Sequence, residues 1–346
     1  MRNCGADKSP SILIALLLEG LVLMFRCHTL VLTSLLACFC PGVLMAQLQV
    51  DPNLPVYKRV SGVSGTIKSI GSDTMNNMMT LWAEGFQEIY PNVQIEIEGK
   101  GSSTAPPALI QGTATFGPMS RPMKANEIDD FEKRYGYKPT ELGTSIDMLA
   151  VYVNKDNPIE GLELAQVDAI FSTNRKGGAD KDITRWGELG LTGAFAQSPI
   201  SLYGRNSASG TYAFFKENAL FGGDYKPSVK EQPGSSSVVQ GVATDKFGIG
   251  YSGIGYKTSD VRALPLSVEG TDFVQPTAEN ADDYPLSRFL FVSVNHRPGS
   301  ELDPLRREFL KYIYSQQGQK AVVKDGYLPI PASIAKAQLE KVGIKN

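Results

Sequence analysis

Three segments of the chain combine glycine with small hydroxyl residues where an expected strand gives way to an expected helix. They are GSDTM (71–75), GSST (101–104) and RNSASGT (205–211). The first turn of a helix carries unpaired backbone N–H groups and a partial positive charge, and therefore attracts anions. Glycine lets the backbone approach a ligand closely, and each Ser or Thr adds a hydroxyl donor. Arg205 would add a full charge in a fork geometry suited to phosphate. If the three helix starts converge, they predict a site for a small oxyanion.

Helix capping is the alternative explanation for each segment taken alone, because Ser, Thr and Asp are the preferred N-cap residues of any helix. The repetition of the pattern and the adjacent arginine favour binding. A fourth segment, FGPMSRPM (116–123), places Ser120 and Arg121 at the end of an expected strand, where they could equally form a surface turn. The methionines of the first expected helix recur at helical spacing, so we expect them in the core rather than at a metal.

Composition narrows the function classes. The chain has 346 residues, 42% hydrophobic and 20% charged, with a formal net charge of −2. That length favours two domains, and the charge gives no basic face for nucleic acid. All four cysteines lie within the first 40 residues, and the histidines are His28 and His296. We therefore expect no metal site, no cofactor and no enzyme, since a phosphatase or esterase needs a metal cluster or a general base beside a nucleophile.

Residues 1–46 are typical of an export signal. An apolar run, 29–46, follows Arg26 and ends in a small residue, so we expect cleavage after Ala46. Two alternatives are lipidation at Cys38, within a lipoprotein-like box, and a retained membrane helix, since the run nearly reaches the ~20 residues that span a bilayer. Met24 is an alternative start of the protein.

Strand-like and helix-like patterns alternate after a linker at 47–60, which predicts an α/β fold. We expect strands at 63–70, 93–99, 114–119, 148–154, 200–205, 248–254 and 289–295. We expect helices at 74–90, 105–112, 209–220, 235–245, 308–326 and 333–342. The apolar run MLAVYVN (148–154) is typical of a buried parallel sheet.

With these motifs in place, residues 62–340 resemble the phosphate-binding periplasmic protein of the high-affinity phosphate ABC transporter. GSDTM, GKGSSTA, FGPMSRPM and RNSASGT are similar to that family's ligand loops in the same order, and segments 169–190 and 248–256 also resemble it. The most specific of the motifs is RxxxSGT.

The resemblance implies a set of ligand residues. Phosphate contacts are expected from Thr74, the backbone N–H of Met75, Ser102, Arg205, Ser209, Gly210 and Thr211. Ser120 is a further candidate, and weaker candidates are Ser72, Asp73, Ser103 and Arg121.

The resemblance also implies a two-lobe, type II-like binding-protein fold that closes about a hinge. Residues 61–150 plus 288–346 would form lobe one and residues 151–287 lobe two, with the chain crossing near 148–154 and 289–295. Phosphate would bind between the lobes of a periplasmic monomer, which would deliver it to a permease with a cytoplasmic ATPase. The alternatives are a binder of sulfate, molybdate or tungstate, a secreted phosphatase, and an extracellular adhesin-like role of the same fold.

One departure concerns the acceptor for the ligand's proton. In the best-known members an aspartate stands where this sequence has Ser120. Asp147, directly before the apolar crossover strand, is the replacement we expect first, and Asp73 is the alternative. A carboxylate there would favour protonated phosphate over sulfate, which carries no proton.

Overall fold

The computed structural model of the chain describes residues 48–345. The expected features at Met24, Cys38 and Ala46 lie outside these residues. The strands are β1 (Gly65–Ile70), β2 (Val93–Glu98), β3 (Phe116–Met119), β4 (Thr140–Asn154), β5 (Leu162–Glu163), β6 (Ser201–Arg205), β7 (Lys230–Gln232), β8 (Gly248–Gly253), β9 (Val261–Ala263), β10 (Leu266–Ser267) and β11 (Ser287–Val294). The α-helices are α2 (Asn76–Ile89), α3 (Ala105–Gln111), α4 (Ala125–Tyr135), α5 (Leu164–Phe171), α6 (Gly210–Asn218), α7 (Ser235–Thr244), α8 (Pro304–Ile313), α9 (Gln316–Lys324) and α10 (Ala332–Glu340). Short 3₁₀ turns are η1 (Asp73–Met75), η2 (Ser102–Thr104), η3 (Trp186–Leu189), η4 (Gly193–Phe195), η5 (Ile254–Tyr256) and η6 (Ala278–Asn280).

A mixed sheet runs through the described chain in the order β2-β1-β3-β11-β4-β8-β6-β7, with β9 also paired to β4. Its two ends are parallel, since β1 pairs with β2 and β3, and β6 pairs with β7 and β8. The middle is antiparallel, because β11 runs against β3 and β4. The α/β class expected from the sequence is confirmed.

The long strand β4 belongs to both halves of this sheet. Its residues 140–148 pair with β11, and its residues 149–153 pair with β8. All of these pairings are antiparallel, so the parallel surroundings expected for MLAVYVN are wrong. A continuous apolar run reports burial on both faces and carries no information about strand direction.

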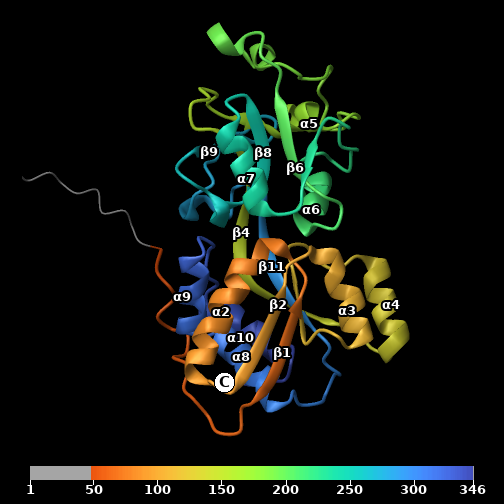
Figure 1. The fold of residues 1–346 in the computed structure, drawn as a ribbon, viewed down its shortest axis with the longest axis vertical. Coiled ribbons are helices and arrows are strands. Elements are labelled where there is room, and N and C mark those ends of the chain that lie inside the picture. The colour runs from red at the N-terminus through yellow and green to blue at the C-terminus, as the bar shows by residue number, and fades with distance from the viewer. Residues whose placement is uncertain (1–47, 346) are drawn as a thin grey trace, which may run out of the picture. The chain divides into compact units, whose positions relative to one another are not determined.

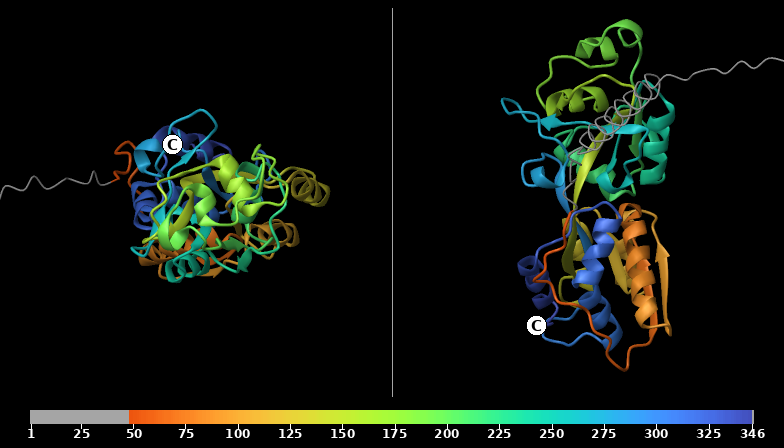
Figure 2. Two further views of the ribbon diagram at one scale, coloured as in Figure 1. Left: turned by 90° about the horizontal axis from the view of Figure 1, so that it is seen from above. Right: turned by 90° about the vertical axis from the view of Figure 1, so that its left-hand side faces the viewer.

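Two large apolar clusters flank the antiparallel middle of the sheet. The first gathers residues of α2, α8, α9 and α10, including Trp82 and Phe86. The second gathers residues of α5, α6, β6 and β8, including Phe171 and Phe215. We call them core one and core two. In Figures 1 and 2 the helices form two groups, and β4 and β11 run between them.

Two local expectations need correction. The expected helix 308–326 is two helices, α8 and α9, because Ser315 interrupts it and accepts a hydrogen bond from the Gly318 N–H at 3.2 Å. The expected linker is packed in its middle, where Leu54 and Tyr57 are buried in core one. Helices α4 and α5 have no counterpart among the expected elements.

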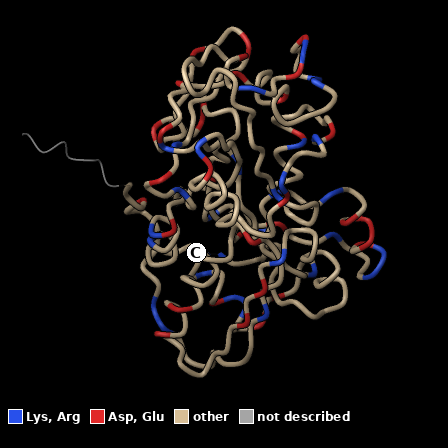
Figure 3. The backbone as a smooth tube through the Cα atoms, turned by 45° about the horizontal axis from the view of Figure 1, so that its top comes forward, with Lys and Arg blue, Asp and Glu red and all other residues tan. Residues whose placement is uncertain are grey.

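Charged residues of both signs are interspersed along the described chain (Figure 3). Within residues 48–345, no helix combines the length and the apolar character needed to cross a membrane. Over the same residues, no group of three or more His, Cys, Asp or Glu side chains is placed to hold a metal ion.

Candidate functional site

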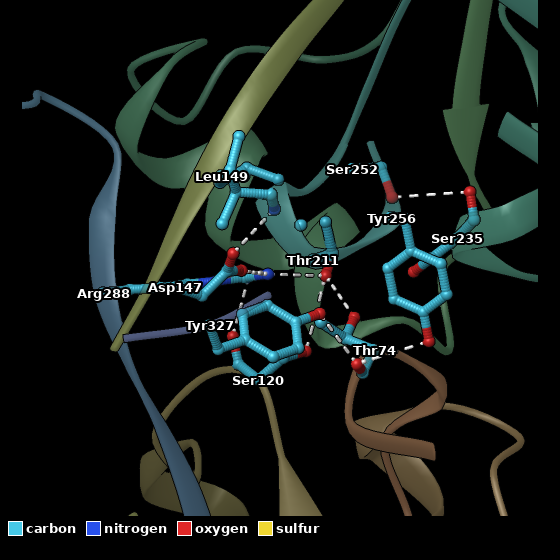
Figure 4. Close-up of polar contacts among 12 residues, drawn as sticks. Thr74, Ser120, Asp147, Leu149, Thr211, Ser235, Ser252, Tyr256, Arg288 and Tyr327 are labelled. Carbon is cyan, nitrogen blue, oxygen red and sulfur yellow. Dashed lines mark hydrogen bonds and ion pairs between the residues drawn. The ribbon is translucent and has the colours of Figure 1, made fainter. Parts of the chain in front are cut away.

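Four hydroxyl groups from four separate segments meet between core one and core two. We call Thr74, Ser102, Ser120 and Thr211 the hydroxyl cluster, and all four are at most 1% exposed. Thr74 Oγ1 lies 2.8 Å from Thr211 Oγ1, and Ser102 Oγ lies 3.2 Å from Ser120 Oγ. Ser120 Oγ and Thr211 Oγ1, 3.5 Å apart, join the two pairs. Figure 4 shows Thr74, Ser120 and Thr211 pointing toward one another. The structure therefore brings together the candidate hydroxyls of all four motifs.

Each hydroxyl is held at the end of a strand by the turn that follows it. Thr74 lies in η1 after β1, Ser102 in η2 after β2, and Ser120 directly after β3. Since β1, β2 and β3 are parallel, their carboxyl ends meet at one edge of the sheet. Thr211 arrives from the other side, in the first turn of α6 after β6.

The capping alternative applies to only one of the segments. Ser209 caps α6, since its Oγ accepts hydrogen bonds from the N–H groups of Thr211 at 3.1 Å and Tyr212 at 3.3 Å. The residues that precede η1 and η2, Ser72 and Gly101, make no side-chain cap bond. Thr74 and Ser102 therefore face the cluster without serving as caps.

Two glycines allow the segments to approach this closely. A Cβ on Gly210 would lie 2.3 Å from Ser102 Oγ and 2.6 Å from Ser120 Oγ. A Cβ on Gly101, whose φ is +116°, would lie 2.5 Å from the backbone oxygen of Ala208. Nearby, Ser103 N–H donates to that same Ala208 oxygen at 3.1 Å. The RNSASGT segment thus lies against the end of β2 with no room for a side chain at either glycine.

Arg205 is 1% exposed and pairs with Asp73, the residue directly before Thr74 of the hydroxyl cluster. Its Nη1 donates to Ser235 Oγ at 2.7 Å, and its Nη2 lies 3.2 Å from Asp73 Oδ2. Burial lowers the pKa of Arg205, and the charge of Asp73 opposes that shift. The guanidinium is a donor-only group and stays protonated. Among the described residues, its Nε makes no hydrogen bond.

Asp73 joins the two halves of the site. Its Oδ2 accepts the Ser235 N–H at 2.8 Å, so the aspartate caps α7 rather than the helix that follows it in sequence. Its backbone oxygen accepts from Tyr256 Oη at 3.0 Å. Ser235 and Tyr256 are therefore site neighbours that our sequence reasoning missed. A signal existed for Ser235, which follows the first residue, Gly234, of the GSSSVV segment and so repeats the glycine–serine pattern of the other motifs.

A second buried arginine, Arg288, was also missed. It is 7% exposed and donates to Asp147 Oδ2 through Nε at 3.0 Å and Nη2 at 2.7 Å. Nη2 also donates to Thr211 Oγ1 at 2.9 Å, and Nη1 donates to the backbone carbonyl oxygen of Ser120 at 2.8 Å. Figure 4 shows Arg288 and Asp147 side by side next to Thr211. The argument that singled out Asp147, a charged residue directly before an apolar crossing strand, would have found Arg288 as well.

Asp147 is fully buried, and both of its oxygens have partners in the protein. Oδ2 accepts from Arg288, and Oδ1 accepts the Ile254 N–H at 3.0 Å. The structure therefore places this first-choice acceptor in an ion pair behind Thr211.

The remaining candidates lie at the margin of the cluster. Arg121 pairs with Glu127 through two short hydrogen bonds, and its Nη2 lies 3.4 Å from Ser103 Oγ. The Met75 side chain is part of core one, which leaves its backbone as the group expected at the ligand. Ser72 Oγ is buried and has no hydrogen-bond partner among the described residues.

Comparisons with known proteins agree with this geometry. The PBP superfamily domain matches residues 59–317. Over 306 residues the chain is 54% identical to the Phosphate-binding protein PstS of Pseudomonas aeruginosa, covering 88% of this chain and 95% of the relative. The chain belongs to the PBP superfamily, in the family of these PstS proteins.

More distant relatives show the same similarity. Protein SphX of Synechococcus elongatus is 26% identical, over 87% of this chain and 88% of the relative. A solved structure from Clostridium perfringens, assigned as a phosphate ABC transporter substrate-binding protein and holding phosphate, superposes with a TM-score of 0.65. It is 26% identical and covers 77% of this chain and 100% of that one. A structure from Vibrio cholerae, 23% identical with a TM-score of 0.59, shows the same fold.

Proposed function

We propose that this protein captures inorganic phosphate outside the cytoplasm and presents it to an ABC importer. The observation that carries the proposal is the hydroxyl cluster. Four buried hydroxyls from four motifs meet, and the buried guanidinium of Arg205 pairs with Asp73, which directly precedes Thr74 of this cluster. Water-excluded donors supplied by helix starts and an arginine fork suit a small oxyanion, whose hydration shell they replace. The family supports phosphate as that oxyanion.

The donors at the ligand are the residues brought together here. We assign phosphate contacts to Thr74, the Met75 N–H, Ser102, Ser120, Arg205, Ser209, Gly210 and Thr211. Ser72 directly precedes η1 and Ser103 lies in η2, and both are weaker candidates. Arg121 is the weakest of the cationic candidates, because Glu127 already binds it.

The acceptor for a proton on phosphate is better assigned to Asp73 than to Asp147. Asp73 is 23% exposed at its side chain and pairs with Arg205 at the cluster, and both of its side-chain contacts use Oδ2. Among the described residues no hydrogen bond ends on its Oδ1. Asp147, in contrast, is saturated by Arg288 and Ile254. Asp73 then replaces the aspartate that the family resemblance led us to expect at Ser120.

Capture would use hinge closure of the two lobes, with the boundaries given above. Thr74, Ser102 and Ser120 follow β1, β2 and β3 at one end of the sheet, whereas Arg205 ends β6 near the other end and Thr211 lies at the start of α6. We infer a monomer that engages a transporter permease and performs no chemistry on the ligand. Export through residues 1–46 would place it in the periplasm, and N-terminal sequencing of the exported protein distinguishes cleavage after Ala46 from lipidation at Cys38.

Calorimetric titration of phosphate, arsenate and sulfate into the mature protein tests the proposal. We expect phosphate and arsenate to bind one site and sulfate to bind far more weakly. Tight binding of sulfate with no phosphate binding would contradict it. Incubation with a chromogenic phosphoester checks the enzyme alternative, since turnover by the purified protein would show a hydrolase.

A further inference from the structure

We propose that Arg288 is a positioning residue that directs the Thr211 hydroxyl proton toward the bound anion. The proposal rests on the proposed phosphate function and adds a residue that no ligand motif of the sequence contains. It assigns Arg288 a role in affinity through Thr211 rather than through contact with phosphate.

The polarity of the Thr211 hydroxyl carries the argument. A guanidinium can only donate, so Thr211 Oγ1 must accept in its 2.9 Å hydrogen bond with Arg288 Nη2. A hydroxyl has one proton, and that proton is then left for another acceptor. The other neighbours of Oγ1 are Thr74 and Ser120 of the hydroxyl cluster, where the anion is proposed to bind. Arg288 therefore makes Thr211 a donor to the ligand and discourages the opposite orientation.

Arg288 is held in place from several directions. On the sheet its Cα pairs with that of Asp147 across β11 and β4, so the two side chains share a face. Two donated hydrogen bonds then fix the guanidinium on Asp147 Oδ2. Its Cζ lies 5.0 Å from the ring centroid of Phe214. Phe214 follows Thr211 by three residues and so lies on the same side of α6.

The same arginine also links the loop after β3 to α6, because Nη1 donates to the backbone carbonyl oxygen of Ser120 at 2.8 Å. Ser120 and Thr211 thus approach one another across a common guanidinium. The compact ammonium of a lysine would keep the positive charge, but it could not donate to Asp147, Thr211 and Ser120 at the same time. Replacing Arg288 by lysine therefore separates geometry from electrostatics.

Two simpler roles must be distinguished from positioning. A buried ion pair can be purely structural, and breaking it then lowers stability without regard to Thr211. If Arg288 contacted phosphate directly, replacing Arg288 would lower phosphate affinity whether or not Thr211 keeps its hydroxyl. Only the positioning role predicts that the effect of Arg288 depends on Thr211.

The test is a double-mutant cycle on phosphate affinity, measured by calorimetry with Arg288→Lys, Thr211→Val and the double variant. We expect each single change to weaken phosphate by about 10-fold or more, the effect of losing a hydrogen bond to a charged group. In the Thr211→Val background, Arg288→Lys should change affinity by no more than about 2-fold, because coupled residues are not additive. Arg262→Lys is the matched control. Arg262 is partly buried and donates to the backbone oxygens of Asn157 and Ile159, so affinity should be unchanged.

Additive losses in the cycle would overturn the proposal in favour of direct contact, and unchanged affinity in Arg288→Lys would remove Arg288 from binding altogether. If that variant does not fold, Asp147→Asn serves in the same cycle, since it keeps Arg288 and removes its anchor. Again, additivity with Thr211→Val would overturn the proposal. Failure of the proposed function would be recognised separately, because the unmodified protein would then bind no phosphate.

Discussion

At the scale of single residues, the two buried arginines already make hydrogen bonds and ion pairs within the protein. Arg205 reaches Asp73 and Ser235, while Arg288 reaches Asp147, Thr211 and Ser120. Each buried guanidinium has a carboxylate partner, so neither adds an uncompensated charge to the interior. Anion selectivity should then depend on which carboxylate a ligand meets.

Arg205→Met should weaken phosphate binding by about 100-fold or more, because the anion and Asp73 both lose a buried charged partner. Calorimetry of the purified variant measures this, and circular dichroism verifies the fold. Arg134→Met, which removes an exposed arginine of α4, is the control for general loss of charge. Undiminished phosphate affinity in a folded Arg205→Met protein would take Arg205 out of the site.

The two aspartates should respond differently to loss of charge. We expect Asp73→Asn to relax the exclusion of sulfate, since the repulsion of an unprotonated anion is gone, and to weaken phosphate by about 10- to 150-fold. Asp147→Asn should weaken both anions alike through Arg288 and leave their ratio unchanged. Titration of phosphate and sulfate into both variants measures the ratio. If only Asp147→Asn altered it, our original preference for Asp147 would be restored.

At the scale of elements, the site depends on how closely strand ends and helix starts can approach. The turns after β2 and β3 meet the RNSASGT segment at Gly101 and Gly210, and neither glycine has room for a Cβ. The cap of α7 is supplied by Asp73 from the distant η1 turn. Small displacements of these elements should therefore change phosphate affinity.

Gly210→Ala tests that approach. The added Cβ would overlap Ser102 Oγ and Ser120 Oγ, so the hydroxyls must separate, although alanine favours the helix. We expect phosphate affinity to fall by about 10-fold or more, because a displaced hydroxyl loses its hydrogen bond to the charged ligand. The melting temperature without ligand should fall by only a few degrees, because the higher helix propensity of alanine offsets part of the cost of overpacking. A fall in melting temperature with full phosphate affinity would show that the glycine serves folding alone.

Asp325, at the end of α9, should make stability depend on pH. Burial raises the pKa of Asp325 from 3.8 to about 7, and the charge of Asp147 adds to the rise. The folded protein then holds this proton where the unfolded chain has lost it. The contribution is thus complete below pH 3.8 and is lost as the pH rises through about 7. Urea unfolding at several pH values should show Asp325→Asn more stable than the unmodified protein at pH 8, with the difference shrinking at low pH. Asp156→Asn, at an exposed site, is the control. If the free energies of unfolding of Asp325→Asn and of the unmodified protein differed by the same amount at every pH, the assignment would be contradicted.

At the scale of the whole molecule, β4 and β11 link the half of the sheet beside core one to the half beside core two. β4 pairs with β11 over its first part and with β8 over its second, and Asp147 stands just before the change of partner. A hinge at this place would move the donors of core one against those of core two. Binding energy from a shared anion would then be available to close the lobes.

Small-angle scattering should show a smaller radius of gyration with saturating phosphate than without it. Gly101→Ala is the matched variant, because its Cβ would strike the Ala208 oxygen and should hold the lobes apart. We expect its profile to stay expanded when phosphate is added. Identical profiles of the unmodified protein with and without ligand would count against hinge closure.

Local chemistry was sufficient to predict the α/β class, most strands and helices, and the four motifs that hold the hydroxyl cluster. These follow from patterns within a few residues: apolar periodicity, glycine beside Ser or Thr, and a strand leading into a helix. It could not predict the antiparallel partners of β4, because an apolar run is the same beside any neighbour. Nor could it show that Asp147 meets Arg288 or that Asp73 caps α7. Those residues lie 141 and 162 positions apart in the chain, and only tertiary folding decides which charges lose water together and become partners.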